Sequence, residues 1–128
     1  ERGLVGHSDA YVVAHACADA LLGAAGLGDI GQHYPDTDPA WKGADSLAIL
    51  RDVAAKVTTL GWRIGNVDCS VVCESPRIAP SRDTMVSLLS EAAGAPVSVK
   101  GRRAEGLGAI GRSEGIACFA SAVIIKES

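Results

Sequence analysis

The fold is decided by the stretch GWRIGNVDCSVVC at residues 61–73, in which apolar and polar residues alternate. One side of the stretch is apolar and the other is polar, with Val67, Cys69, Val71 and Cys73 set against Asn66, Asp68 and Ser70. Alternation with a period of two is typical of a β-strand that buries one face. Gly61, at the start of the stretch, ends a helical pattern. The chain therefore passes from helix to strand at this glycine.

Two helices are predicted before this strand. Ser8 caps the first helix and Gly26 and Gly28 end it; its apolar positions recur with helical spacing at Val12, Val13, Ala16, Ala20 and Leu21. The second helix begins at Asp45, and its apolar stripe is Leu47, Leu50, Val53, Ala54 and Val57. Between them, residues 27–44 are rich in Gly, Asp and Pro, which predicts a long loop of the kind that is usually functional or disordered.

Downstream of the strand, the pattern predicts one more helix and two more strands. The helix ends at Gly94 and has its apolar side at Met85, Leu88, Leu89 and Ala92. Residues 96–100 form a short strand and residues 101–115 a polar, glycine-rich connection. Residues 116–126 form a closing strand that is apolar on both faces and is therefore expected to be buried on both. The order helix, helix, strand, helix, strand, strand predicts an α+β sandwich with the helices on one side of a sheet.

The composition indicates one soluble globular domain over residues 1–128. A chain of 128 residues with 48% hydrophobic and 21% charged residues is long enough to bury one core. The formal net charge of -3 provides no basic surface for nucleic acid. No apolar run approaches the roughly 18 residues of a membrane helix, and no signal-peptide pattern opens the chain. The four cysteines form no C-x-x-C pair, so we interpret them as reduced core thiols.

His15 is the first candidate for chemistry. Asp19 lies four residues further along the predicted helix, so the two side chains share a face. Neutral imidazole is a common zinc ligand, and a carboxylate one turn away can orient the ring or join it as a ligand. A catalytic zinc ion normally takes three protein ligands, so the spacing alone leaves a hydrogen-bonded structural histidine as the alternative.

Two further segments have the composition of phosphate and ribose sites. His7 and Ser8 lie at the predicted helix start, where free N–H groups favour an anion; a capping serine beside an exposed histidine is an equally good explanation. Asp29, in the Gly-Asp-Ile-Gly segment at residues 28–31, can accept two hydrogen bonds from a ribose diol. Ordinary turn chemistry explains such a segment more often.

A third candidate patch is charged. Arg102 and Arg103 are residues that grip phosphate oxygens, and the nearby Glu105 can carry a divalent metal ion. Arg112 and Glu114 lie beside the closing strand, where they form either a solvated turn or a salt-bridge network in the interior or at an interface. Each of these signals is weak when taken alone.

Together the segments resemble the 2-C-methyl-D-erythritol 2,4-cyclodiphosphate synthase family. Between residues 6 and 46 the resemblance rests on the motifs GHSD, GDIG, YPDTDP and KGADS and on the spaced pair His15 and Asp19. Further along, it rests on IGNVD at residues 64–68 and on GRSEGIAC at residues 111–118. It covers essentially the whole chain.

The resemblance implies a ferredoxin-like α+β sandwich that assembles as a homotrimer, with active sites between adjacent subunits. It implies a phosphorus–oxygen lyase of the non-mevalonate route to isoprenoids, in the cytoplasm of a bacterium or the plastid stroma of a plant or alga. The reaction converts 4-diphosphocytidyl-2-C-methyl-D-erythritol 2-phosphate to 2-C-methyl-D-erythritol 2,4-cyclodiphosphate and releases CMP. A Zn²⁺ ion, or a similar divalent metal, polarises the β-phosphate, and Mg²⁺ or Mn²⁺ bridges the diphosphate.

Matched residue by residue, the resemblance also implies the site. His7 stabilises the transition state, Ser8 binds the substrate beside it, and His15 is a zinc ligand. The ribose turn is Asp29, Ile30 and Gly31, and the loop around the erythritol portion is Tyr34, Pro35, Asp36, Thr37 and Asp38. The cytosine pocket is formed by Cys73, Glu74, Ser75, Pro76, Arg77, Ile78 and Ala79.

The remaining matches fall on the charged patch. Substrate contacts are implied for Arg102, Arg103, Ala104 and Glu105, of which Arg103 is also catalytic and Glu105 holds the second divalent ion. Ala109 and Arg112 match positions that line the central cavity of the trimer, where the family can hold an isoprenoid diphosphate.

The chain departs from the family's pattern at several positions. The Asp-x-His motif that supplies two zinc ligands lies upstream of Glu1, so we expect the domain over residues 1–128 to lack its N-terminal strand or strands and this motif. Tyr11 replaces an aspartate, Arg103 replaces a phosphate-binding threonine, and Ala109 replaces a cavity-lining phenylalanine.

These departures leave two alternatives open. One is a catalytically silent or truncated trimer subunit, or an isoprenoid-diphosphate-binding scaffold, without a complete zinc site. The other is one half of a bifunctional enzyme whose fused or associated upstream domain is the cytidylyltransferase of the same pathway.

Overall fold

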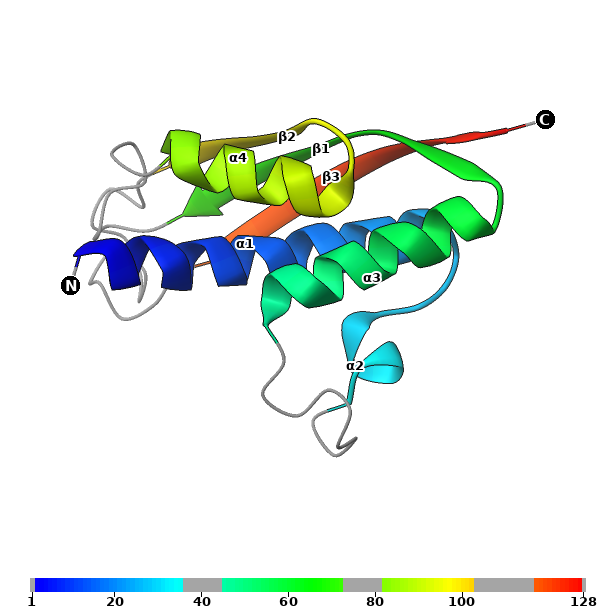
Figure 1. The fold of residues 1–128 in the computed structure, drawn as a ribbon, viewed down its shortest axis with the longest axis horizontal. Coiled ribbons are helices and arrows are strands. Elements are labelled where there is room, and N and C mark those ends of the chain that lie inside the picture. The colour runs from blue at the N-terminus through cyan, green and yellow to red at the C-terminus, as the bar shows by residue number, and fades with distance from the viewer. Residues whose placement is uncertain (1, 36–44, 73–81, 103–116, 128) are drawn as a thin grey trace.

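The computed structural model describes residues 2–35, 45–72, 82–102 and 117–127, with side chains from residue 12 onward. The helices and strands in these residues are α1 (Arg2–Ala24), α2 (Ile30–His33), α3 (Ser46–Thr59), β1 (Trp62–Val72), α4 (Arg82–Ala93), β2 (Val97–Arg102) and β3 (Ala117–Lys126) (Figure 1). None of the described helices combines the length and apolar character that a membrane span requires.

The three described strands form one sheet in the order β2-β1-β3. β1 is parallel to β2, with Cys69 opposite Val99, and antiparallel to β3, with Cys69 opposite Ala120. The parallel pair is joined through α4, because parallel strands need a crossover connection. Gly65 lies at a bulge in β1, where a Cβ atom would come within 3.2 Å of the Val123 carbonyl oxygen of β3. The absence of a side chain there lets β3 approach closely.

The helices cover one face of this sheet, as predicted for the α+β class (Figure 1). The alternate residues Val67, Cys69 and Val71 of β1 are fully buried against them. On β3, the residues that pack against the same core are Cys118, Ala120, Ala122 and Ile124. No described helix covers the opposite face, which displays Asp68 and Ser70 of β1. The alternation predicted around residue 69 is therefore confirmed.

The second predicted helix is also confirmed. The Asp45 carboxylate caps α3 by accepting a hydrogen bond from the Leu47 backbone N–H, at 2.9 Å between Oδ1 and N. The predicted apolar stripe, Leu47, Leu50, Val53, Ala54 and Val57, is buried throughout. Gly61 follows the helix with a φ of +94°, a left-handed conformation that favours glycine. The predicted features of α4 also hold, since Met85 and Leu89 are buried and Gly94 ends the helix at a φ of +67°.

The first helix differs from the prediction in its start and in its buried face. α1 begins at Arg2, so the predicted cap at Ser8 is wrong and that residue lies within the helix. Its described buried positions are Val13, Ala14, Cys17, Ala18, Leu21 and Leu22, whereas Val12 is 38% exposed. The buried face is shifted by one position because α1 packs against both β3 and α3, and every residue at positions 12–22 except His15 and Asp19 is apolar. In these positions the sequence marks the polar side of the helix, at His15 and Asp19, but the apolar surface is too wide for it to specify which apolar residues are buried most deeply.

A short helix, α2, lies within the segment predicted as a loop. Asp29 caps it by accepting from the Gln32 backbone N–H at 2.9 Å, and the Gln32 side chain accepts from the Asp29 backbone N–H at 3.1 Å. This reciprocal pair is a capping box, which satisfies two N–H groups at the helix start. Gly28 has a φ of +96°, and a Cβ atom there would clash with the Gln32 side chain. The remainder of the predicted loop, residues 36–44, lies outside the described residues.

Both later strands differ from the prediction at particular residues. β2 extends to Arg102, two residues beyond the predicted end. The expectation that the closing strand is buried on both faces is wrong for the single chain, because β3 exposes Phe119 (67%), Val123 (53%) and Ile125 (38%). These side chains alternate with the core-facing ones and point to the face of the sheet that no described helix covers.

Candidate functional site

The candidate site is built on the exposed face of α1 and the turn that follows this helix. His15 and Asp19 are both exposed and lie one turn apart on α1. The Asp19 carboxylate accepts a hydrogen bond from the Ile30 backbone N–H, at 2.8 Å between Oδ1 and N. The contact that Asp19 makes is therefore to the turn, rather than the predicted contact to the His15 ring. This bond fixes the predicted ribose turn, residues 28–31, against the end of α1.

Asp29 lies at the exposed tip of this turn and combines two functions. Its Oδ1 atom accepts the capping bond from Gln32, which orients the carboxylate. The residue nevertheless remains exposed, so a ligand can reach its carboxylate. An ionised carboxylate offers about four lone-pair sites, which suits a pair of neighbouring hydroxyl groups.

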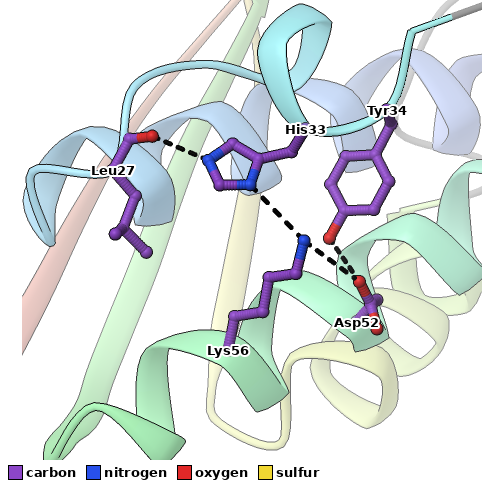
Figure 2. A network of polar contacts seen from close by, with 5 residues as sticks. All are labelled: Leu27, His33, Tyr34, Asp52 and Lys56. Atoms are coloured by element: carbon purple, nitrogen blue, oxygen red, sulfur yellow. Dashed lines mark hydrogen bonds and ion pairs between the residues drawn. The ribbon is translucent and has the colours of Figure 1, made fainter.

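After the turn, the chain is bound to α3 by a network of polar contacts (Figure 2). The Tyr34 hydroxyl donates to Asp52 Oδ2 at 2.5 Å, and the Lys56 ammonium lies 3.6 Å from the same oxygen. Lys56 Nζ also lies 3.4 Å from His33 Nδ1 and 4.5 Å from the centre of the Tyr34 ring. His33 Nε2 lies 2.7 Å from the Leu27 carbonyl oxygen, which closes the network on the turn itself.

The hydrogen-bond partners in this network indicate which atoms of His33 and Tyr34 carry a hydrogen. A carbonyl oxygen can only accept, so His33 Nε2 carries the hydrogen and Nδ1 accepts from the Lys56 ammonium. Burial and then the hydrogen bond to Asp52 raise the pKa of Tyr34 above its ordinary value. Tyr34 is therefore a neutral hydrogen-bond donor at neutral pH, and its side chain points toward α3.

A second polar cluster lies on the open face of the sheet. Asp68 of β1 accepts from Lys100 Nζ at 2.7 Å and from the Ser98 hydroxyl at 2.8 Å, both on β2. The hydrogen bonds from Lys100 and then Ser98 lower the pKa of the Asp68 carboxyl. Arg102, one of the predicted substrate-binding residues, is exposed at the end of β2. Its guanidinium Nη1 donates a hydrogen bond to the carbonyl oxygen of the preceding residue, Gly101, at 3.4 Å.

Three of the four cysteines lie beside one another in the core. Cys17 Sγ of α1 lies 3.2 Å from Cys69 Sγ of β1, and both residues are fully buried. Cys118 of β3 is half-buried nearby. All three are free thiols, so the prediction of reduced core cysteines is confirmed for them, while Cys73 lies outside the described residues. The hydrogen bond to Cys69 and burial raise the pKa of Cys17, and burial raises that of Cys118 to about 12.

Comparison with known proteins connects this geometry to a family. The profile of the YgbB family matches residues 1–125. The chain belongs to the YgbB family. It is 52% identical over 130 residues to 2-C-methyl-D-erythritol 2,4-cyclodiphosphate synthase of Bordetella petrii, a match that covers 99% of this chain and 80% of that protein. This confirms the family resemblance of the sequence motifs.

Two further relatives of this YgbB chain are a longer, bifunctional protein and a protein whose structure was solved in complex with CDP. The bifunctional enzyme IspD/IspF of Anaeromyxobacter dehalogenans is 53% identical over 127 residues, and the chain spans 33% of its length. The solved structure of Plasmodium falciparum IspF in complex with CDP superposes with a TM-score of 0.79 at 31% identity, covering 91% of this chain and 72% of that one. The fold class predicted from the sequence is thus that of the YgbB relatives.

The YgbB enzymes are metal-dependent, which makes the ligand set of this chain important. The exposed His15 imidazole is suited to a metal, but Asp19 is engaged by the turn. Among the residues that the structure describes, no three His, Cys, Asp or Glu side chains are grouped to hold an ion. The described part of the YgbB domain therefore contributes one candidate ligand, whereas a catalytic zinc ion takes three.

The other predicted site residues are placed only in part. His7 and Ser8 lie in α1, but their side chains are outside the described set. Wholly outside the described residues are Asp36, Thr37, Asp38, Cys73, Glu74, Ser75, Pro76, Arg77, Ile78, Ala79, Arg103, Ala104, Glu105, Ala109 and Arg112. Of the predicted residues, the structure thus places Asp29, Ile30, Gly31, Tyr34 and Pro35 in the turn and short helix after α1, while His15 lies one helical turn before Asp19, the residue of α1 that binds Ile30.

The sequence reasoning missed the residues of this YgbB chain that support the turn. Gln32 follows Asp29 with capping-box spacing, and this signal was present in the sequence. Asp52 and Lys56 have the i, i+4 spacing of a helical ion pair, which is equally typical of a solvated helix face. Their contacts to Tyr34 and His33 join segments that are 18 and 23 residues apart, so local spacing alone carries no sign of them.

Proposed function

We propose that this chain cyclises 4-diphosphocytidyl-2-C-methyl-D-erythritol 2-phosphate to 2-C-methyl-D-erythritol 2,4-cyclodiphosphate with release of CMP. An oxygen of the 2-phosphate attacks the β-phosphorus of the cytidine diphosphate. The bond from the β-phosphorus to the oxygen that bridges it to the α-phosphorus breaks, and CMP departs with that oxygen. One observation carries the proposal: the Asp19–Ile30 hydrogen bond holds the proposed ribose turn at the end of the helix that presents His15.

The proposed roles follow the chemistry of each group. Asp29 accepts hydrogen bonds from the ribose hydroxyls, with its carboxylate oriented by the capping bond to Gln32. His7 and Arg103 stabilise charge on the transferred phosphoryl group, and Arg102 contributes a further positive charge. Reactions of this kind depend on positioning and charge neutralisation more than on proton transfer.

His15 and Glu105 are the proposed metal-binding residues, for Zn²⁺ and for Mg²⁺ or Mn²⁺ respectively. A metal ion bound there would neutralise phosphate charge and polarise the β-phosphorus. The imidazole of His15 is exposed on the same face of α1 as the residue that holds the turn, which supports its assignment. The other zinc ligands in this proposal come from outside the described residues.

We also propose a homotrimer with active sites between subunits. The open face of β3 supports it, because Phe119, Val123 and Ile125 form an apolar row that is costly to leave in water. A fused or associated cytidylyltransferase is the second proposed partner, supported by the bifunctional relative. The proposed compartment is the bacterial cytoplasm, or the plastid stroma for a plant or algal protein.

The alternative is a silent trimer subunit or an isoprenoid-diphosphate-binding scaffold. It is favoured by one specific observation, the single candidate metal ligand among the described residues. CMP release from the cytidine diphosphate substrate separates the two. The enzyme hypothesis expects turnover in the presence of Zn²⁺ and Mg²⁺, whereas the alternative expects none.

Two variants and a control make this experiment specific. Asn is as good a helix cap as Asp, so Asp29→Asn keeps the cap, removes the charge and is expected to weaken substrate binding. His15→Gln is expected to lower kcat at least about 100-fold and to lower bound zinc. Arg51→Ala, which breaks an exposed ion pair between α3 and Glu91 of α4, is the matched control. Wild-type turnover that both site variants leave unchanged would place the activity elsewhere on the molecule.

A further inference from the structure

We propose that Asp52 and Lys56 of α3 are positioning residues, which act through Tyr34 and His33 to hold the turn at residues 28–31 in its ligand-binding orientation. This inference rests on the proposed function, since it concerns the turn that is proposed to bind the ribose. Neither residue need contact the substrate for this effect.

The turn requires outside support because α2 is too short to hold itself. A helix of four residues makes barely one turn of hydrogen bonds, and isolated helices of this length are unstable in water. The described contacts anchor the segment at both ends. At its start the Ile30 N–H binds Asp19 of α1, and at its end Tyr34 and His33 bind α3.

Of the two residues that bind the end of this segment to α3, Tyr34 makes a stronger contact than His33. Its side chain is 4% exposed, and its hydroxyl donates to the Asp52 carboxylate at 2.5 Å. A hydrogen bond to a charged acceptor is stronger than one between neutral groups. Tyr34 lies three residues beyond Gly31, so fixing its ring on α3 determines how far the turn can move.

Lys56 joins the parts of the network to one another. Its ammonium lies 3.6 Å from Asp52 Oδ2, 3.4 Å from His33 Nδ1 and 4.5 Å from the Tyr34 ring centre (Figure 2). His33 in turn donates to the Leu27 carbonyl, immediately before the turn. One cation therefore contacts the carboxylate, the ring and the imidazole that together fix both sides of the turn. An ordinary surface ion pair along one helix would contact only the carboxylate.

Graded variants of the anchor test this inference. Tyr34→Phe removes the hydroxyl and keeps the ring, Asp52→Asn keeps an acceptor but removes the charge, and Asp52→Ala removes both. Arg51→Ala is the control, because Arg51 precedes Asp52 on α3 but pairs with Glu91 of α4, 3.1 Å away. Three measurements apply to each variant: the Kd for CMP by calorimetry, the separate kcat and KM values, and the amide hydrogen exchange of residues 27–34.

We expect Tyr34→Phe and Asp52→Ala to raise the Kd for CMP and the KM about fivefold, to leave kcat within about twofold, and to speed exchange of the turn about fivefold. Asp52→Asn should have a smaller effect than Asp52→Ala. The double variant Tyr34→Phe/Asp52→Asn should lose less than the sum of the two single variants, because both change the Tyr34–Asp52 contact, while only Asp52→Asn also removes the ion pair with Lys56. Lys56→Met should speed exchange on both sides of the turn.

Results that contradict the positioning role of Asp52 and Lys56 differ from results that contradict the proposed cyclisation activity. Exchange and KM that match the Arg51→Ala control in every anchor variant would overturn the positioning role. A fall in kcat with unchanged KM would also overturn it, because that pattern indicates a group acting only in the transition state. A wild-type protein that neither binds CMP nor releases it would refute the proposed function, while the exchange measurement would still report whether α3 anchors the turn.

Discussion

Replacing Phe119 by alanine is expected to weaken the proposed trimer more than it weakens the fold. Phe119 lies on β3, an edge strand of the described sheet, and is 67% exposed in the single chain, on the face of the sheet that no described helix covers. Its neighbours on that face include Val123 and Ile125, which are exposed as well. The substitution therefore removes apolar surface that the described residues leave exposed and that the proposed trimer would bury.

The magnitude follows from the exposed area. Full burial of a phenylalanine side chain contributes about 1.5–3 kcal/mol, so burial of the remaining two thirds contributes about 1–2 kcal/mol per subunit. Three copies lose about 3–6 kcal/mol in the free energy of assembly, or about two to four orders of magnitude in the assembly constant. Because assembly depends on the cube of the monomer concentration, the concentration of half-dissociation changes as the square root of the assembly constant and is expected to rise about 10- to 100-fold.

Sedimentation velocity over a range of protein concentrations measures this shift directly. Leu60→Ala is the control, because Leu60 is 50% exposed but lies at the end of α3 in the helical layer. Thermal unfolding of the dissociated species shows whether the fold survives. CMP release should fall in parallel with the trimer fraction if the active sites lie between subunits.

Two outcomes would refute the reasoning. A dissociation midpoint equal to that of Leu60→Ala would mean that the open face of β3 is not a subunit interface. A wild-type chain that remains monomeric at every concentration would mean that Phe119 is exposed in the functional protein.

The remaining predictions concern the core and the titration of buried groups. Leu50→Ala should lower the free energy of unfolding by about 2–5 kcal/mol, measured by urea denaturation, because Leu50 is fully buried between the helices and the sheet; a loss below about 1 kcal/mol would contradict this packing. Burial raises the pKa of Cys118 from 9.0 to about 12, so the folded state keeps the thiol protonated where the unfolded chain ionises. The resulting stabilisation is complete below about pH 9 and is lost as the pH rises toward about 12, with Tyr34 acting in the same direction. Urea midpoints between pH 8 and pH 11 test this, and Cys118→Ala should flatten the decline without removing it.

The local sequence determined the elements whose patterns are unambiguous. The alternation around Cys69 predicts β1, the cap at Asp45 and the spacing of Leu50 and Val53 predict α3, and Gly94 marks the end of α4. Each of these signals lies within one element, where backbone geometry relates neighbouring side chains directly. The motifs containing His15 and Asp29 likewise identify the family from sequence alone.

Tertiary packing alone decided the rest. The residues of α1 that are buried most deeply depend on the two layers between which it packs, because its apolar surface is wider than one stripe. Asp19 is a partner of the turn and not of His15, and Tyr34 is fixed by Asp52, because both contacts join segments that are distant in sequence. Burial of the outer face of β3 requires a surface that the described residues do not supply. A local pattern specifies which residues avoid water, but the choice of the surface that covers them is made only when the elements pack together.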